Sequence, residues 1–382
     1  MPPTAAEIDA TAFEQELRAG RELTVLDVRD ADAFAAWHLA APHATIVNLT
    51  EDAVTADPGG ALAALPAEAP VRVICNVGNM SLRVARLLAG RAPDVRSVHG
   101  GMVCWSRVLQ VSPIPVAGPV AVAQFRREAR GCLSYLLIAG GDALVVDPAP
   151  DVAAYVDAAV ARGARIRRVL DTHVHADHLS GARDLAHRTG AVLHLSAAAL
   201  ARGIRHAGDV APVTDGDVLA LGDSSVTVLA LPGHTSDMTG LRLGDAALIG
   251  GDSVFLDAIA RPDLEVGAAG SGDAARELHR TLRERIGPLP DPMLLLPGHY
   301  AGGRRDGPLV ATLGEVRAAV PELALDEDAF VGHVLADMPP RPANYLAITR
   351  VNLGEELDAD TASRLEVGAN NCAARRVPAD AA

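Results

Sequence analysis

The chain has 382 residues and a formal net charge of −14, and all 34 of its basic residues are arginine. This acidic balance argues against binding to a nucleic-acid backbone, which needs a surplus of basic residues on one face. We find neither a secretory signal nor an apolar stretch long enough to cross a membrane, so we expect a cytoplasmic protein of two to three domains.

The four cysteines indicate a reducing compartment. Cys75, Cys104, Cys132 and Cys372 show no paired or C-x-x-C spacing, which fits free thiols rather than disulfides. Cys104 and Cys132 lie in apolar runs, where we expect them to be core residues.

Cys75 is the first residue along the chain with a predicted chemical role. Buried strands are expected over 23–28 and 71–74, and the second leads directly to Cys75. The loop 75–81 then turns into an amphipathic helix. A sulfur at the start of a helix meets backbone N–H groups and the positive end of the helix dipole, and both favour its anionic form. The pattern predicts a thiolate, or a persulfide carried on the same sulfur.

This first part, over about residues 8–108, resembles a single rhodanese domain. The similarity rests on residues 26–30, on the Cys75 loop with Gly78 and Ser81, and on His99-Gly100-Gly101-Met102 before Trp105. The resemblance implies an α/β domain over 1–112 in which Cys75 carries sulfur, followed by a proline-rich linker over 113–119. Rhodaneses usually carry arginine where this chain has Met80, so we expect weak binding of thiosulfate. A rhodanese fold used only for docking is the alternative.

The segment 171–178, Asp-Thr-His-Val-His-Ala-Asp-His, carries the strongest chemical signal in the chain. It follows an apolar run that predicts a buried strand. His173 and His175 are two residues apart on extended backbone, so their side chains leave the same face. Asp177 and His178 come where the chain turns toward the next helix. Imidazole nitrogen and carboxylate oxygen are ligands that suit zinc, iron or manganese.

Three more candidate ligands each follow a short apolar run that predicts a strand. They are His234, Asp252 and His299. A strand holds such a residue rigidly at a sheet edge, and the glycines beside these residues let the backbone bend close to a metal. Together with the segment 171–178 they supply five histidines and two aspartates as possible ligands.

These motifs resemble the metallo-β-lactamase superfamily, whose fold is an αββα sandwich with metal ions at the sheet edge. We expect this sandwich over 120–354 and a polar, alanine-rich tail over 355–382. The segments 131–135, 145–148 and 260–264 resemble the branch that contains glyoxalase II and persulfide dioxygenases. The predicted fold class is therefore α/β, with a rhodanese-like domain followed by the αββα sandwich.

In the persulfide dioxygenases that the chain resembles, two histidines and one aspartate hold one non-haem iron. The resemblance places them at His173, His234 and Asp252, with one Fe(II) per chain. It leaves the positions of a second metal site to His175, Asp177, His178 and His299. Such an enzyme oxidises a low-molecular-weight thiol persulfide with O2 to sulfite. The rhodanese-like domain favours this hypothesis, as does Val174, where glyoxalase II enzymes usually have a further histidine.

Two other functions stay open. In a thioester hydrolase of the glyoxalase II type, all seven ligands would hold two zinc ions, with Asp252 bridging them. The chain would otherwise be a non-catalytic sulfur relay or persulfide sensor. Arg261 is a candidate to bind a substrate carboxylate, although an ion pair with Asp263 explains it equally well. We expect no nucleic-acid or membrane partner, and a homo-oligomer is compatible with the sequence.

Overall fold

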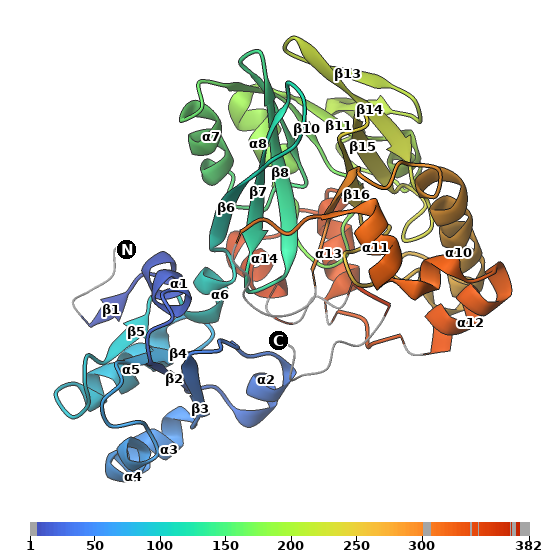
Figure 1. Cartoon of the computed structure of the whole chain (residues 1–382). Helices are drawn as coiled ribbons and strands as arrows, with labels where there is room; N and C mark the ends of the chain where they lie inside the picture. Colours follow the sequence, from blue (N-terminus) through green and yellow to red (C-terminus); the bar gives the residue numbers. More distant parts are fainter. Residues whose placement is uncertain are drawn as a thin grey trace.

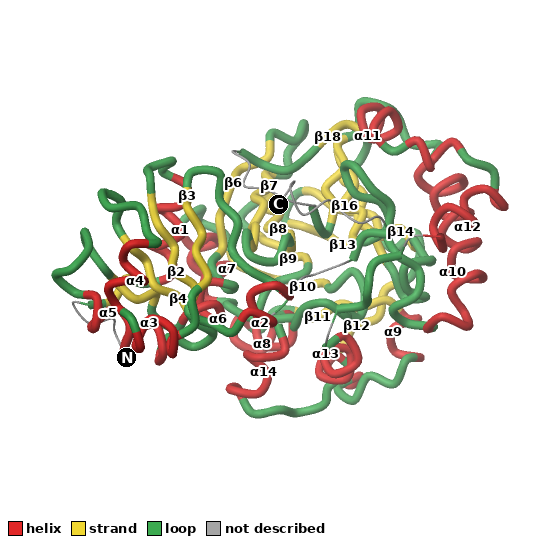
Figure 2. The backbone as a smooth tube through the Cα atoms, turned by 90° about the horizontal axis from the view of Figure 1, so that it is seen from below, coloured by secondary structure: helices red, strands yellow, loops and turns green. Residues whose placement is uncertain are grey.

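The computed structural model describes residues 6–300, 307–336, 338–342, 344–366, 368 and 372–374. Two α/β domains follow one another along the chain, as the sequence predicted (Figure 1). Figure 2 shows the five-stranded sheet of the first domain beside the two sheets of the second. Among the residues described, no helix has the length and apolar character needed to cross a membrane.

The first domain is built on a parallel sheet with the strand order β1-β5-β4-β2-β3. Its strands are β1 (Glu7–Ile8), β2 (Leu23–Asp27), β3 (Ala44–Asn48), β4 (Val71–Ile74) and β5 (Arg96–Val98). Its helices are α1 (Ala10–Arg18), α2 (Ala31–Ala36), α3 (Glu51–Ala56), α4 (Pro58–Ala63), α5 (Asn79–Leu88) and α6 (Gly101–Trp105). Val73 packs in one core cluster with α5, whereas the next residue, Ile74, packs in another with α1. Helices therefore cover both faces of the sheet, as a parallel sheet requires.

The second domain contains two sheets. The seven-stranded sheet has the order β12-β11-β10-β9-β8-β7-β6, and the six-stranded sheet runs from β13 to β18 in sequence order. The first comprises β6 (Leu109–Ile114), β7 (Ala121–Arg127), β8 (Cys132–Ala139), β9 (Asp142–Val146), β10 (Arg165–Leu170), β11 (Val192–Ser196) and β12 (Val210–Val213). The second comprises β13 (Val218–Leu221), β14 (Ser224–Ala230), β15 (Thr239–Leu243), β16 (Ala247–Gly251), β17 (Leu294–Pro297) and β18 (Ala311–Thr312).

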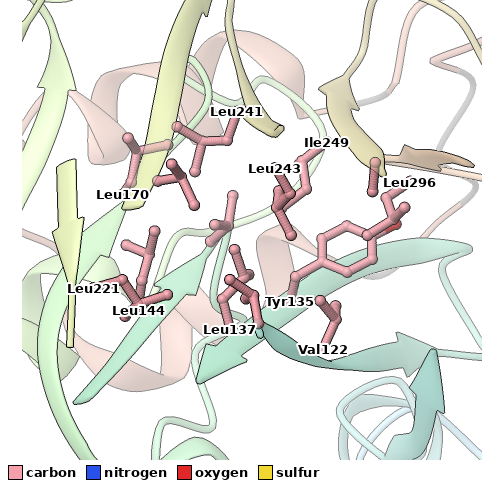
Figure 3. Close-up of a cluster of buried hydrophobic side chains, with 14 of the residues drawn as sticks. Val122, Tyr135, Leu137, Leu144, Leu170, Leu221, Leu241, Leu243, Ile249 and Leu296 are labelled. Carbon is pink, nitrogen blue, oxygen red and sulfur yellow. The ribbon is translucent and has the colours of Figure 1, made fainter. Parts of the chain in front are cut away.

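Apolar side chains from both sheets form the core between them. Figure 3 shows Tyr135 and Leu144 of the first sheet in the same cluster as Leu241 and Ile249 of the second. The hydroxyl of Tyr135 donates a hydrogen bond of 2.6 Å to the carbonyl of Pro297, which ties β8 to β17 inside this core. A buried hydroxyl needs such a partner, so the two sheets are fixed in position as well as packed.

Helices cover the outer faces and complete the αββα arrangement. Helices α7 (Ala153–Val160) and α8 (Ala182–Thr189) pack on the seven-stranded sheet. Helices α10 (Gly267–Thr281), α11 (Leu313–Ala319) and α12 (Glu327–Ala336) belong to the core cluster of the six-stranded sheet. The other α-helices described in this domain are α9 (Ala197–Ala201), α13 (Tyr345–Asn352) and α14 (Ala359–Leu365). The predicted fold class is confirmed.

The two domains are joined more closely than expected. Helix α6 ends at Trp105, β6 begins at Leu109, and β6 pairs with β7 along its whole length. Pro113, expected in the linker 113–119, lies in β6 opposite Ala123. An edge strand tolerates proline, which has no N–H to donate. The predicted linker is thus corrected to a loop between two strands of the second domain.

Two polar contacts bind the domains at this junction. The Nε of Arg127 donates a hydrogen bond of 3.0 Å to the carbonyl of Ser106, directly after α6. Arg18 of α1 forms an ion pair of 2.6 Å with Glu128, whose side chain is almost fully buried.

Candidate active sites

Cys75 lies where β4 ends and the chain turns toward α5. Its Sγ accepts hydrogen bonds from the backbone N–H groups of Gly78 at 3.2 Å and Ser81 at 3.4 Å. The hydroxyl of Ser81 lies 3.3 Å from the same sulfur. Gly78 has a φ of +88°, a conformation that glycine adopts without strain, and it turns the loop around the sulfur. These donors and the positive end of α5 favour a negative charge on Cys75.

The loop lacks a cation of its own. Met80 stands where rhodaneses usually carry arginine, and it packs against the core cluster that includes Cys75. Arg83, one turn further along α5, pairs instead with Glu51 at 2.6 Å and 2.8 Å. The geometry therefore suits a small sulfur anion held by N–H groups better than a doubly charged donor such as thiosulfate.

Three of the predicted ligands converge in the second domain. One ligand atom each from His173, His234 and Asp252 lies within 4.8 Å of the other two, and all three residues are buried. Each follows the end of a strand: His173 comes after β10, His234 after β14 and Asp252 directly after β16. Gly298 permits the close packing here, since a Cβ on it would lie 2.2 Å from an oxygen of Asp252.

The unpaired atoms of this group fit a metal ion. Nδ1 of His234 lies 2.7 Å from the carbonyl of Arg261, so Nε2 faces Asp252. Nδ1 of His173 contacts the hydroxyl of Thr172 at 3.0 Å, and its Nε2 has no hydrogen-bond partner. Both carboxylate oxygens of Asp252 are also buried without a hydrogen bond. Buried polar atoms are rarely left unsatisfied unless they bind something, and ring nitrogens fixed from behind are typical of metal ligands.

His175 is not part of this group, although the sequence placed it among the second-site positions. Its Nε2 lies 3.2 Å from Asp147 and 3.9 Å from Asp171, and these three residues form a separate buried cluster. Its Nδ1 has no hydrogen-bond partner. The structure thus turns one end of the ring away from the three converging ligands and toward β9.

The remaining second-site positions gather in a neighbouring cluster. Asp177, His178 and His299 lie together with Cys132, with one ligand atom from each within 4.8 Å of the others. Nε2 of His299 lies 3.2 Å from Asp252 and 3.4 Å from Asp177, so it stands between the two groups. Cys132 was expected to be a core residue. It is buried as expected, and its sulfur lies 3.6 Å from a carboxylate oxygen of Asp177.

Neighbouring charges in this second cluster shift the pKa values of its residues strongly. Burial alone would lower the pKa of His299, but the carboxylates of Asp252 and Asp177 raise it well above its usual value. Burial would raise the pKa of the Cys132 thiol, but neighbouring His178 lowers it to about 6. Buried acidic groups and imidazoles thus lie together in this cluster, an arrangement in which a cation balances the negative charge.

Arg261 forms the ion pair that the sequence offered as the alternative to substrate binding. Its side chain is buried and contacts Asp263 at 2.7 Å and 3.2 Å, and Asp263 also pairs with Arg341 at 2.7 Å. The carbonyl of Arg261 lies 2.7 Å from Nδ1 of His234 and fixes that ring. The binding of a substrate carboxylate by Arg261 stays a prediction.

The loop 171–181 carries four of the candidate metal ligands and is called the metal loop below. The segment after residue 354 supports this loop, whereas the sequence predicted only a polar tail there. Glu366 is buried, and its Oε1 accepts hydrogen bonds from Arg127 at 2.8 Å and from the N–H of Leu179 at 3.1 Å. Arg130 donates to the carbonyls of Asp177 and Glu366. The tail thus holds the metal loop. No local sequence pattern predicts this contact, because Arg127 lies 239 residues before Glu366.

Comparisons with known proteins support both domains. Residues 127–299 match the metallo-beta-lactamase superfamily, and residues 9–107 match the rhodanese-like domain. A hydroxyacylglutathione hydrolase of Acidiphilium cryptum is 38% identical over 44% of this chain, but the match spans only 63% of that relative. The hydroxyacylglutathione hydrolase of Anaeromyxobacter dehalogenans is 31% identical over 66% of this chain and 93% of its own length.

A second activity occurs among the similar proteins. The mitochondrial persulfide dioxygenase ETHE1 of Homo sapiens is 28% identical over 56% of this chain and 80% of that protein. The crystal structure of ETHE1 from Myxococcus xanthus matches with a TM-score of 0.53 and 28% identity, over 60% of this chain and 96% of that one. These similarities show the fold and the branch, and the chemistry of the site must distinguish the two activities.

Proposed function

The chain belongs to the metallo-β-lactamase superfamily and carries a rhodanese-like domain, and on that premise we propose that it is a persulfide dioxygenase. The reaction converts a thiol persulfide, O2 and water into the free thiol, sulfite and two protons. The terminal sulfur is oxidised, O2 is reduced, and the sulfur–sulfur bond breaks. The substrate is a persulfide of a small thiol.

One observation carries this proposal. Two histidines and one aspartate, His173, His234 and Asp252, converge as a buried group, while Nε2 of His175 faces Asp147. A two-histidine, one-carboxylate set is the donor set of non-haem Fe(II) oxygenases, in which the ion keeps open positions for a substrate and O2. The protein's own part is to orient His234 through the Arg261 carbonyl and to keep the ligands away from bulk water.

The rhodanese-like domain supplies the second argument. Cys75 and its N–H donors suit the transfer of sulfane sulfur, which a dioxygenase acting on persulfides uses and a thioester hydrolase does not need. The two activities in one chain then share the same kind of sulfur compound.

Thioester hydrolysis is the second candidate, and the identity to hydroxyacylglutathione hydrolases favours it. It requires a second metal ion close to the first. The cluster of Asp177, His178 and His299 beside Asp252 offers a place for one.

Oxygen uptake on full-length protein purified without air distinguishes the candidates. We expect the Fe(II)-loaded protein to consume O2 and release sulfite in equal amounts when given a small-thiol persulfide, and to leave an S-lactoyl thiol ester intact. Rapid cleavage of the ester by the zinc-loaded protein, without O2 uptake in the iron-loaded one, would identify a hydrolase. A protein that shows neither O2 uptake nor ester cleavage, but in which Cys75 gains sulfur, would be a sulfur relay.

Cys75→Ser is expected to abolish sulfur loading of the first domain and to leave oxidation of an added persulfide nearly unchanged. The Cys75 thiolate attacks the terminal sulfur of a persulfide and releases the small thiol as thiolate, and serine cannot repeat this exchange. Mass spectrometry after polysulfide treatment measures the gain of sulfur. Cys104→Ser is the matched control. Sulfur gained by another cysteine while Cys75 stays unmodified would leave the first domain as a docking fold.

A further inference from the structure

Asp237 is a buried carboxylate that lies close to the metal ligands without being a candidate ligand. It follows His234 by three residues, and its side chain is fully buried. Among the described residues it belongs to none of the clusters that could hold a metal ion. A carboxylate loses its hydration when it is buried, so hydrogen bonds and an opposite charge must replace the lost water. The partners of Asp237 therefore indicate what it does.

One partner of Asp237 is the metal loop. Its Oδ2 accepts a hydrogen bond of 2.8 Å from the N–H of Val174, the residue directly after His173. Residues 171–180 are all described and form neither helix nor strand, so their buried N–H groups need acceptors outside regular secondary structure. A carboxylate accepts a stronger hydrogen bond than a neutral group does. Asp237 thus fixes the backbone of the metal loop beside a candidate ligand.

A main-chain hydrogen bond fixes the loop on the other side of His173. The N–H of Thr239, at the start of β15, donates to the carbonyl of Thr172 at 2.8 Å. Thr172 and Val174 flank His173, so the segment that follows His234 holds the metal loop on both sides of this ligand. The two imidazole rings lie with their centroids 5.1 Å apart and their planes at 87°. These bonds fix the backbone of one histidine relative to the other.

The second partner of Asp237 is a cation that balances its charge. Arg202, directly after α9, donates to Oδ1 of Asp237, while Oδ2 accepts from Val174. The Nε of Arg202 lies 3.3 Å from Glu265, which accepts hydrogen bonds from the N–H and the hydroxyl of Ser236 at 2.6 Å and 2.8 Å. Each oxygen of the buried carboxylate therefore has its own partner, and the side chain is held in one orientation.

We propose that Asp237 is a positioning residue that sets the spacing of His173 and His234, and with it the affinity and geometry of the metal ion that they bind. It acts through the backbone of the metal loop and does not touch the ion. The inference rests on the proposed function for a metal bound at His173, His234 and Asp252, but it holds for either reaction at that metal. Groups that orient metal ligands typically contribute a factor of about 10–100 to metal affinity.

Cobalt titration of the metal-free, full-length protein tests this role. We expect Asp237→Ala to weaken Co(II) binding by about 10–100-fold. We also expect it to change the visible absorption of the bound Co(II), which depends on the geometry of the ligands. Glu265→Gln is the matched control, because it alters a partner of the same arginine and leaves the bond between Asp237 and Val174 in place. Equal weakening of Co(II) binding in both variants would overturn the proposal.

Two double variants separate positioning from the loss of an ion pair. Asp237→Ala also deprives the largely buried Arg202 of a partner, which by itself destabilises the protein. Arg202→Met removes that charge. Combined with Asp237→Asn it leaves an oxygen to accept from the N–H of Val174, and combined with Asp237→Leu it does not. We expect tight Co(II) binding with the wild-type absorption only in the combination with Asp237→Asn. Equal binding in both combinations would show that Asp237 only neutralises Arg202.

The titration also separates this role from the proposed reaction. If the wild type binds Co(II) and Asp237→Ala weakens that binding as expected, a lack of O2 uptake by the iron-loaded protein would reject the dioxygenase and leave the positioning role in place. If the wild type binds no Co(II), both the metal site and the role of Asp237 would be wrong.

Discussion

Alanine in place of His173, His234 or Asp252 is expected to leave the protein without bound iron and to reduce O2 uptake to the background rate. Each residue supplies one of the three donors of this group, so its loss leaves an ion with two of them. Loss of Asp252 also removes the carboxylate that faces His299. Iron content of anaerobically reconstituted variants and persulfide-dependent O2 uptake measure the effect.

His299→Ala is the informative comparison for these three variants. His299 stands between the two clusters, 3.2 Å from Asp252, but it lies outside the three-residue group. We expect this variant to keep most of its iron. Equal loss of iron in all four variants would show that the two clusters form one dinuclear centre, and the mononuclear assignment would then be wrong.

Replacing Glu366 with alanine is expected to lower the free energy of unfolding by about 3–5 kcal/mol, as when a buried ion pair loses one partner. Both side chains of the pair with Arg127 are almost fully buried, so the arginine is left as a buried charge. The N–H of Leu179 in the metal loop loses its acceptor as well. Urea unfolding of the metal-free protein measures the change without a contribution from bound ions.

Glu355→Ala is the matched control, since it removes a carboxylate from the same C-terminal region. Glu355 is partly exposed and pairs with Arg350 at 3.4 Å, so its loss should cost at most about 1 kcal/mol. Replacing Arg127 and Glu366 together by apolar residues should restore part of the lost stability, because no unpaired charge then stays buried. A similar urea midpoint of unfolding for Glu366→Ala and Glu355→Ala would mean that Glu366 does not hold the metal loop.

The convergence of the candidate metal ligands was predictable from the sequence because they come directly after strands. The loop 171–178 follows β10, and the other three residues follow β14, β16 and β17. The Cys75 loop was predictable for the same reason, since β4, Gly78 and α5 follow one another over residues 71–88. In both cases the order of strand, loop and helix within a short segment was sufficient to predict where the functional side chains lie.

The supporting residues were not predictable, because their partners are distant in the chain. Cys132 reads as one more apolar residue of a strand, and only its bridge to His299 reveals its surroundings. Glu366 lies in a polar stretch without periodicity, and its partners stand on β7 and in the metal loop. For Arg261 the sequence left two roles open, and the structure shows the ion pair with Asp263 that one of them requires.

The short connection between α6 and β6 limits how far the first domain can move relative to the second. Three residues separate the two elements, and Arg127 holds the carbonyl of Ser106 at the same junction. The first domain is therefore no swinging arm of the kind that carries a bound intermediate between distant centres. Cys75 is itself almost fully buried. Under the proposed function, sulfur would leave it on a diffusible thiol, so the two domains would communicate through a shared pool of small thiols rather than by direct delivery.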